Sequence, residues 1–337
     1  MFKKILKITA ILLLVLIIIT GATYGVIHRG VPLQGEAEMG QESILVPENL
    51  DDEEINIDVI SYNVRLITKE DIEEHYWTNR KEPMINLLDN YNADIIGFQE
   101  VTHPQYEYLI KHLGDEYGYY GIYRSGLNRE RGDSIISDTD PEPHLFNNLR
   151  IMVVDEGSPI FYRKSRFELL DYDTFWLRED PESPGRGWDA NIRRICSYVE
   201  LLDHYTDEVI TVYNTHFDHK GEVARQKSAD LIYEYIEDSR GTPIAMGDFN
   251  IPEGEEVYNS IVTRSLSDAK YLSPEDKRDS GTTFNGFGEY PHEGPIDYIF
   301  VDDNDFNALS YRIITDRYDD GYYISDHYPV QVELKYK

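Results

Sequence analysis

Short apolar runs of strand length alternate with amphipathic stretches of helical period from about residue 55 onward, and this alternation constrains the fold most strongly. Strands are expected at residues 55–64, 93–101, 158–164, 195–202, 208–218, 242–250, 296–302 and 327–335, the last two as a pair. Helices are expected at residues 80–88, 104–113 and 222–237. The segment 124–157 has no clear period and is expected to be a long surface loop or insertion. Residues 55–337 are therefore predicted to form one α/β domain.

The N-terminus carries a separate signal. Lys3, Lys4 and Lys7 precede an uncharged stretch at residues 8–27, whose length at helical rise matches the bilayer hydrocarbon thickness of about 30 Å. We therefore expect residues 1–29 to be a cytoplasmic basic end with a retained single-pass anchor in the cell membrane, and residues 30–54 to be a tether. The positive-inside rule then places the domain at residues 55–337 outside the cell. A cleaved signal peptide and a secreted domain are the alternative.

The chain is strongly acidic, with a formal net charge of −31. Proteins that bind long nucleic acid non-specifically draw on Lys and Arg contacts to phosphates, usually arranged as a basic stripe. No such stripe is visible in this sequence, so long nucleic acid is an unlikely partner. The single cysteine, Cys196, excludes an intramolecular disulfide, and no protein partner is predicted.

Polar side chains stand at the ends of six of the strand-like runs. They are Asn63 in SYNVR, Glu100 in GFQEV, Asn214 and His216 in NTHFD, Asp248 and Asn250 in GDFN, and Asp326 and His327 in SDHYPV, with Asp297 in IDYIF. Any one of them is explained by a turn or a cap, but their joint occurrence points to a site built at strand ends. Residues two apart on a strand share a face, so each of the pairs in NTHFD and GDFN can address one substrate.

In their order along the chain and in their residues, these clusters resemble the motifs of the endonuclease/exonuclease/phosphatase superfamily. The resemblance covers nearly the whole segment from Ile57 to Val332. GDFN, and SDH with the preceding IDYIF, are the specific parts of the resemblance. The stretches SPIFYRKSRFELLDYDTFWL, GWDANIRRIC and NTHFDHKGEVARQKSA resemble a bacterial branch that is often secreted or membrane-anchored and has no assigned substrate. The resemblance implies a four-layer α/β sandwich of two packed mixed sheets.

The resemblance also implies a role for each cluster. Glu100 would bind Mg²⁺, for which Mn²⁺ is a possible substitute, with Asn63 and Asp326 in support. A carboxylate with an amide and waters suits this hard cation, whereas HEXXH and zinc-finger spacings are absent from the sequence. The catalytic set would be Asp248 and Asn250 at the water and phosphate, His327 oriented by Asp297, and His216 beside them. Whether Asp248 or His327 takes the proton stays open.

Basic side chains near these clusters are candidates for phosphate contacts. Arg194 leads into an apolar strand and Arg65 follows the first motif, so both are predicted to bind substrate together with Asn214. For Arg225, within the helix expected at residues 222–237, a surface ion pair is an equally good explanation.

The sequence therefore predicts a Mg²⁺-dependent hydrolase that cleaves a phosphate mono- or diester, small or lipid-derived, outside the cytoplasm. A secreted or anchored nuclease is the alternative, since fold and motifs alone do not choose between the two. A catalytically silent binding module on the same fold is the second alternative.

Overall fold

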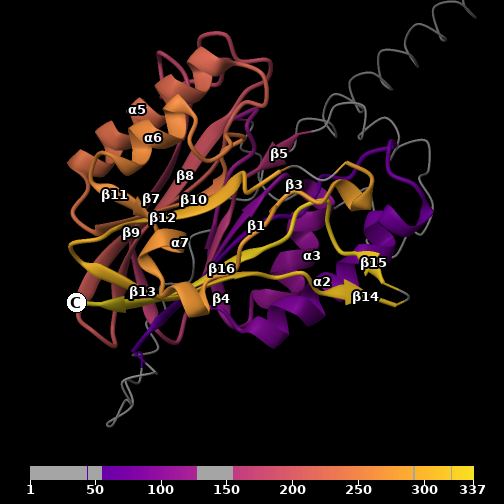
Figure 1. Ribbon diagram of the computed structural model, residues 1–337, viewed down its shortest axis with the longest axis horizontal. Helices are drawn as coiled ribbons and strands as arrows, with labels where there is room; N and C mark the ends of the chain where they lie inside the picture. Colours follow the sequence, from indigo (N-terminus) through magenta and orange to yellow (C-terminus); the bar gives the residue numbers. More distant parts are fainter. Residues whose placement is uncertain (1–43, 45–54, 127–154, 291–292, 320) are drawn as a thin grey trace, which may run out of the picture.

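A computed structural model describes residue 44 and residues 55–126, 155–290, 293–319 and 321–337 (Figure 1). The expected membrane segment at residues 8–27, and the tether apart from Ile44, lie outside the described residues. Within the described part of the chain, no helix is both long enough and apolar enough to cross a membrane.

Two six-stranded mixed sheets form the centre of the domain. In the first, the order is β13 (Phe306–Ile313), β16 (Val330–Tyr336), β1 (Ile57–Asn63), β2 (Ile95–Gln99), β6 (Ile160–Arg163) and β4 (Tyr117–Tyr120). In the second, the order is β11 (Leu266–Asp268), β12 (Asp297–Asp302), β10 (Thr242–Asp248), β9 (Glu208–His216), β8 (Ile195–Asp203) and β7 (Phe167–Trp176). Two small ribbons pair β3 (Val101–Thr102) with β5 (Glu156–Gly157) and β14 (Arg317–Tyr318) with β15 (Tyr322–Tyr323).

Each large sheet contains one parallel pair, and a helix makes each crossover. The helix α2 (Trp77–Tyr91) joins β1 to β2, and α5 (Glu222–Asp238) joins β9 to β10. Parallel neighbours need such a crossover, whereas the other pairs in both sheets are antiparallel. The carboxyl ends of these four parallel strands therefore lie at one end of the sandwich.

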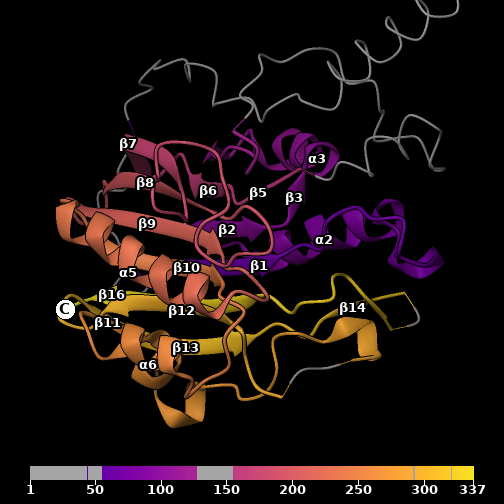
Figure 2. The same ribbon diagram turned by 90° about the horizontal axis from the view of Figure 1, so that it is seen from above.

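The alternation of side chains along each strand sorts the core into layers. Ile57 and Val59 of β1 join Ile244 and Met246 of β10 in a core between the two sheets. The outer face of the first sheet packs against α2 and α3 (His103–Leu113), and that of the second against α5 and α6 (Glu256–Val262). Figures 1 and 2 show these helices on opposite sides of the paired sheets. The expected α/β fold with two mixed sheets is confirmed.

The sheets approach closely just below the strand ends. A Cβ added at Gly97 would lie 2.5 Å from Met246 Cε and 2.9 Å from Asn214 Cγ, so a larger residue there would have to displace these side chains. Beside it, Asn214 Nδ2 donates to the carbonyl oxygens of Phe98 (2.8 Å) and Pro159 (3.0 Å) in the facing sheet. These hydrogen bonds form a polar layer between the sheets, at the end of the apolar core that lies nearest the strand ends.

The structure corrects one detail of the predicted topology. The expected strand pair at residues 296–302 and 327–335 is wrong, because β12 pairs with β10 and β11 while β16 pairs with β1 and β13 in the other sheet. The segment between them also carries β13 and crosses from one layer to the other, which apolar periodicity does not reveal. The short helices α6 and α7 (Ala269–Leu272) were likewise not predicted.

Candidate active site

The two sheets meet at a pair of polar side chains from their parallel strands. Asn63, the last residue of β1, donates from Nδ2 to Oδ2 of Asp248, the last residue of β10, at 3.0 Å. Both side chains are buried, and both continue the inward-facing series of their strands. The strand ends therefore place the SYNVR and GDFN motifs in direct contact, although they lie 185 residues apart.

Asp248 is the centre of this arrangement. Its Oδ2 lies 3.3 Å from Nε2 of His216 and 3.7 Å from Nε2 of His327. Its Oδ1 accepts the backbone N–H of Asn250 at 3.0 Å, in the turn where Asn250 takes a φ of 51°. A single buried carboxylate, with 2% of its surface exposed, is thus surrounded by one amide, two imidazoles and a backbone donor.

His327 is held from behind by a second carboxylate. Its Nδ1 lies 2.9 Å from Oδ2 of Asp297, which directs the other ring nitrogen toward Asp248. The hydroxyl of Thr283 accepts the backbone N–H of Asp297 at 3.1 Å, and the ring of Phe284 packs edge-on against the imidazole. The ring orientation is therefore fixed by hydrogen bonding and by packing.

Burial and charge separate the protonation states of these groups. Burial raises the pKa of Asp248 to about 7, with a further increase from the carboxylate of Asp297. Burial alone would lower the pKa of His327, but Asp297 and Asp248 outweigh it and raise this pKa to about 10. Burial and the cation Arg194 lower the pKa of His216 well below its ordinary value. At neutral pH His327 is therefore protonated, His216 is neutral, and Asp248 titrates.

The remaining acidic motif residues gather around the turn that follows β1. The backbone N–H of Arg65 donates to Asn63 Oδ1 at 3.0 Å, and that of Leu66 donates to Glu100 Oε2 at 2.9 Å. The Arg65 guanidinium lies 3.1 Å from Asp71 Oδ1 and 3.2 Å from Asp326 Oδ2. Residues 63–66 thus connect the three predicted metal ligands, Glu100, Asn63 and Asp326.

This donor set fits Mg²⁺. It offers two carboxylates and an amide oxygen, the hard oxygen ligands that Mg²⁺ prefers, and each is already oriented by an N–H or a guanidinium. A second cluster, Asp248, Asp297 and His327, also brings its ligand atoms within 4.8 Å of one another. Because His327 is protonated there and bonded to Asp297, that cluster would have to lose a proton before it bound a cation. The Glu100 side is the better candidate.

The other predicted substrate residues lie in two places. Arg194 is buried, with Nη1 at 3.0 Å from Glu156 Oε1, and its Nε has no hydrogen-bond partner among the residues that the structure describes. Asn214 lies one layer deeper, where its amide joins the two sheets. Arg225 is buried in α5 and donates to the Asp218 carbonyl at 3.1 Å. Their contacts with substrate stay predictions.

Sequence reasoning missed four residues of the site and its support. Gln99 Nε2 donates to Asn214 Oδ1 at 2.7 Å, and Glu156 bonds both Arg124 and Arg194. Asp71 and Arg80 lie behind Arg65. Gln99 stands next to Glu100 in GFQEV and could have been predicted from the sequence. The sequence pattern around Glu156, Asp71 and Arg80 does not indicate a site. Glu156 falls at the end of the expected loop 124–157, of which residues 127–154 lie outside the described part.

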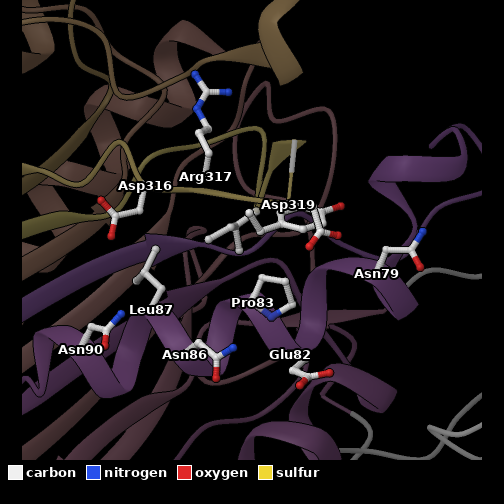
Figure 3. A pocket seen from close by; sticks show the side chains of 11 residues that line it. Asn79, Glu82, Pro83, Asn86, Leu87, Asn90, Asp316, Arg317 and Asp319 are labelled. Carbon is white, nitrogen blue, oxygen red and sulfur yellow. The ribbon is translucent and has the colours of Figure 1, made fainter. Parts of the chain in front are cut away.

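A hollow of about 450 Å³ lies away from these groups, between α2 and the segment leading into β14. Its walls are mainly polar and include Asn79, Asn86, Asn90, Asp316 and Asp319 (Figure 3). It reaches Ile324, which precedes the SDH motif, but none of the catalytic candidates lines it. The hollow is therefore separate from the catalytic centre.

Comparisons with known proteins agree with this geometry. The model of the Endonuclease/Exonuclease/phosphatase family matches residues 60–327. An uncharacterized protein of Acanthamoeba polyphaga mimivirus is 25% identical over 285 residues, which are 76% of this chain and 91% of that protein. The structure of a mannosyl-6-phosphatase of Bacteroides thetaiotaomicron is 29% identical, with a TM-score of 0.69 over 83% of this chain and 99% of that one.

A structure described as an endonuclease/exonuclease/phosphatase from Bacteroides vulgatus is also 29% identical, with a TM-score of 0.70 over 84% of this chain and 99% of that one. The family match spans the first and last motifs, and the two solved structures share the fold over 83% and 84% of this chain. The chain therefore belongs to the endonuclease/exonuclease/phosphatase family, whose members hydrolyse phosphoester bonds.

Proposed function

We propose that this protein is a Mg²⁺-dependent phosphoesterase that releases phosphate from a small phosphomonoester, with sugar phosphates as the first class to test. The observation that carries the proposal is the environment of Asp248. Its Oδ2 lies within 3.7 Å of a protonated imidazole, a neutral imidazole and an amide. Such a group can orient a water while its neighbours neutralise charge on a phosphoryl group.

Asp248 and His327 have different proposed roles at the phosphate. Asp248 holds the attacking water, and His327, fixed by Asp297, donates from Nε2 to an oxygen that gains negative charge. Asn250 and His216 lie beside Asp248 and can bond the equatorial phosphoryl oxygens. Glu100, Asn63 and Asp326 would hold Mg²⁺, which would supply further charge neutralisation.

Asp248 is also the better proton acceptor. Its pKa of about 7 means that it is partly ionised at neutral pH and can take up a proton from water. His327, with a pKa of about 10, already carries its proton and is suited to donate a hydrogen bond. We therefore propose that Asp248, and not His327, takes the proton, a choice that the sequence left open.

Two observations support a small substrate. The mannosyl-6-phosphatase that resembles this chain acts, by its name, on a sugar phosphate, and it aligns over nearly its full length. The net charge of −31 disfavours long polyanions. A nuclease activity is the competing possibility.

The deciding experiment is a substrate screen with the full chain purified in detergent, with and without Mg²⁺. The panel contains hexose 6-phosphates, a phospholipid headgroup diester, and single- and double-stranded DNA, each assayed from about 10 to 200 mM salt. Preferred release of phosphate from the monoesters supports the proposal. Efficient DNA cleavage that falls steeply with salt would replace it with the nuclease, and no turnover on any member would favour a silent binding module.

We also propose that residues 8–27 anchor the domain outside the cytoplasmic membrane, from the charge pattern of Lys3, Lys4 and Lys7. Protease added to intact cells should release the domain by cutting within residues 30–54. Protection until lysis would place the domain inside, and a mature chain beginning near Thr23 would show a cleaved signal peptide.

A further inference from the structure

Arg80 lies fully buried behind the site, with none of its surface exposed. From α2 its guanidinium donates to four carbonyl oxygens, those of His75 (2.6 Å), Val64 (2.9 Å), Ile324 (2.9 Å) and Arg65 (3.2 Å). It also lies 3.9 Å from Asp71. One side chain therefore joins the last two residues of SYNVR to the residue just before SDH.

Two of the carbonyls that Arg80 binds, those of Val64 and Arg65, belong to a strained turn. Arg65 has a φ of 57°, a left-handed conformation that a non-glycine residue keeps only when its surroundings enforce it. Arg80 holds the carbonyls of Val64 and Arg65, and Gln105 Nε2 donates to the same Arg65 carbonyl at 2.7 Å. The turn is thus fixed from its carbonyl side.

The opposite side of this turn faces the predicted metal ligands. Its two N–H groups, on Arg65 and Leu66, point at Asn63 Oδ1 and Glu100 Oε2. The guanidinium of Arg65 pairs with Asp326. Arg80 also binds the carbonyl of Ile324, which lies two residues before Asp326. A change in the turn would therefore move the partners of all three ligands together.

We propose that Arg80 is a positioning residue for the metal side of the active site. By fixing the carbonyls of Val64, Arg65 and Ile324, it aims the N–H groups and the guanidinium that orient Glu100, Asn63 and Asp326. This inference rests on the proposed Mg²⁺-dependent function. It assigns Arg80 no contact with substrate or metal.

The chain offers a matched control for a purely structural arginine. Arg166 has 1% of its surface exposed and binds the carbonyls of Ile55 and Asn56 as well as the carboxylate of Asp203. Its carbonyl partners precede β1, whereas those of Arg80 follow it, so the two arginines lie at opposite ends of that strand. Loss of either one leaves buried carbonyls unpaired, but only Arg80 adjoins the site.

The test compares Arg80→Met, Arg80→Lys and Arg166→Met in the full chain. Two readouts are used: the Mg²⁺ concentration that half-saturates turnover, and the rise in Tm caused by Mg²⁺. The Glu100→Gln variant corrects the second readout for Mg²⁺ bound elsewhere on this acidic chain. Lysine keeps the charge but, with three donors on one nitrogen, cannot span four carbonyls, and it serves as the milder variant if methionine prevents folding.

We expect Arg80→Met to weaken the Mg²⁺ response about 10- to 100-fold, as loss of outer partners of metal ligands commonly does, with Arg80→Lys in between. Arg166→Met should lower Tm without Mg²⁺ yet leave the half-saturating concentration within about twofold of wild type. Equal, unchanged Mg²⁺ responses in both methionine variants would overturn the inference and make Arg80 a structural residue. Absence of any Mg²⁺ response in the wild type would instead overturn the proposed function itself.

Discussion

Asp297 lies directly opposite Asp248 in the antiparallel register of β12 and β10, and His327 reaches both of these carboxylates with its two ring nitrogens. Like charges on adjacent strands repel, and the imidazolium between them relieves that repulsion. These contacts of His327 therefore hold two carboxylates close together across the adjacent strands.

Replacing Asp297 by asparagine should lower the pKa of His327. In the wild type, Asp297 and Asp248 raise this pKa to about 10, so the imidazolium persists until strongly alkaline pH and is lost as pH rises through that value. Without the Asp297 charge, the alkaline limb of kcat should move to lower pH. The measurement is kcat against pH for both proteins, and an unmoved limb would show that activity does not depend on the His327 charge.

Removal of the proposed proton acceptor or donor should lower turnover strongly without unfolding the domain. Asp248→Ala and His327→Ala are each expected to reduce kcat at least about a hundredfold, the usual scale for acid–base and electrostatic groups. Far-UV circular dichroism provides the folding control. A folded variant that retained more than about a tenth of wild-type activity would remove that residue from the mechanism.

Chelation of divalent cations should abolish activity, and Mg²⁺ should restore it, with Mn²⁺ tested as a substitute. Glu100→Gln removes one carboxylate charge from the proposed ligand set and should raise the half-saturating Mg²⁺ concentration by at least about tenfold. Titration of activity with each metal measures the change. Full activity of the chelated wild type would exclude a dissociable Mg²⁺ cofactor.

Asp218 predicts a pH-dependent contribution to stability. Burial alone would raise its pKa, but four backbone N–H groups outweigh it and lower the pKa from 3.8 to about 2. These donors belong to Gly221, Ile192, Lys220 and Asn191. Because the folded-state pKa is depressed, the stabilisation is complete above the unfolded value of 3.8 and is lost as pH falls toward 2.

Asp218→Asn should therefore lower Tm by about 2–4 °C at neutral pH. The difference between the two proteins should shrink as the pH falls below about 4. Thermal melts across this range test the sign. A difference that grew toward acid pH would contradict the assignment.

The sequence predicted residues that the structure brings together at the candidate site, because strand ends leave a readable signal. Asn63, His216, Asp248 and Asp297 close inward-facing rows of apolar residues, and period-two patterning on a strand is among the clearest patterns a sequence offers. The resemblance to the family then supplied the pairing between distant motifs, which no local pattern contains. The helices were found at their apolar centres, with α2 longer than expected at both ends.

The residues that support the site could not be predicted from the sequence. Arg80 stands on a helix, where a lone arginine normally lies on the solvated face, and only the fold shows that it is buried against carbonyls from residues 64 and 324. Glu156 likewise acquires its role from Arg194, 38 residues away in sequence. Side chains that bind backbone atoms of other segments leave no periodic signal.

The position of β16 beside β1 in the first sheet has a consequence for biosynthesis. It lies between β13 and β1, so Ile57 pairs with Leu334 across nearly the whole length of the described domain. While the ribosome is still producing the second sheet, β1 has an unpaired edge, which is a known route to aggregation. Such distant pairing also slows folding, since a large loop must close before the contact forms. The nascent domain should therefore depend on chaperones that shield β1 until β16 has been synthesised. Overproduction should lead to inclusion bodies when too little of such a chaperone is present.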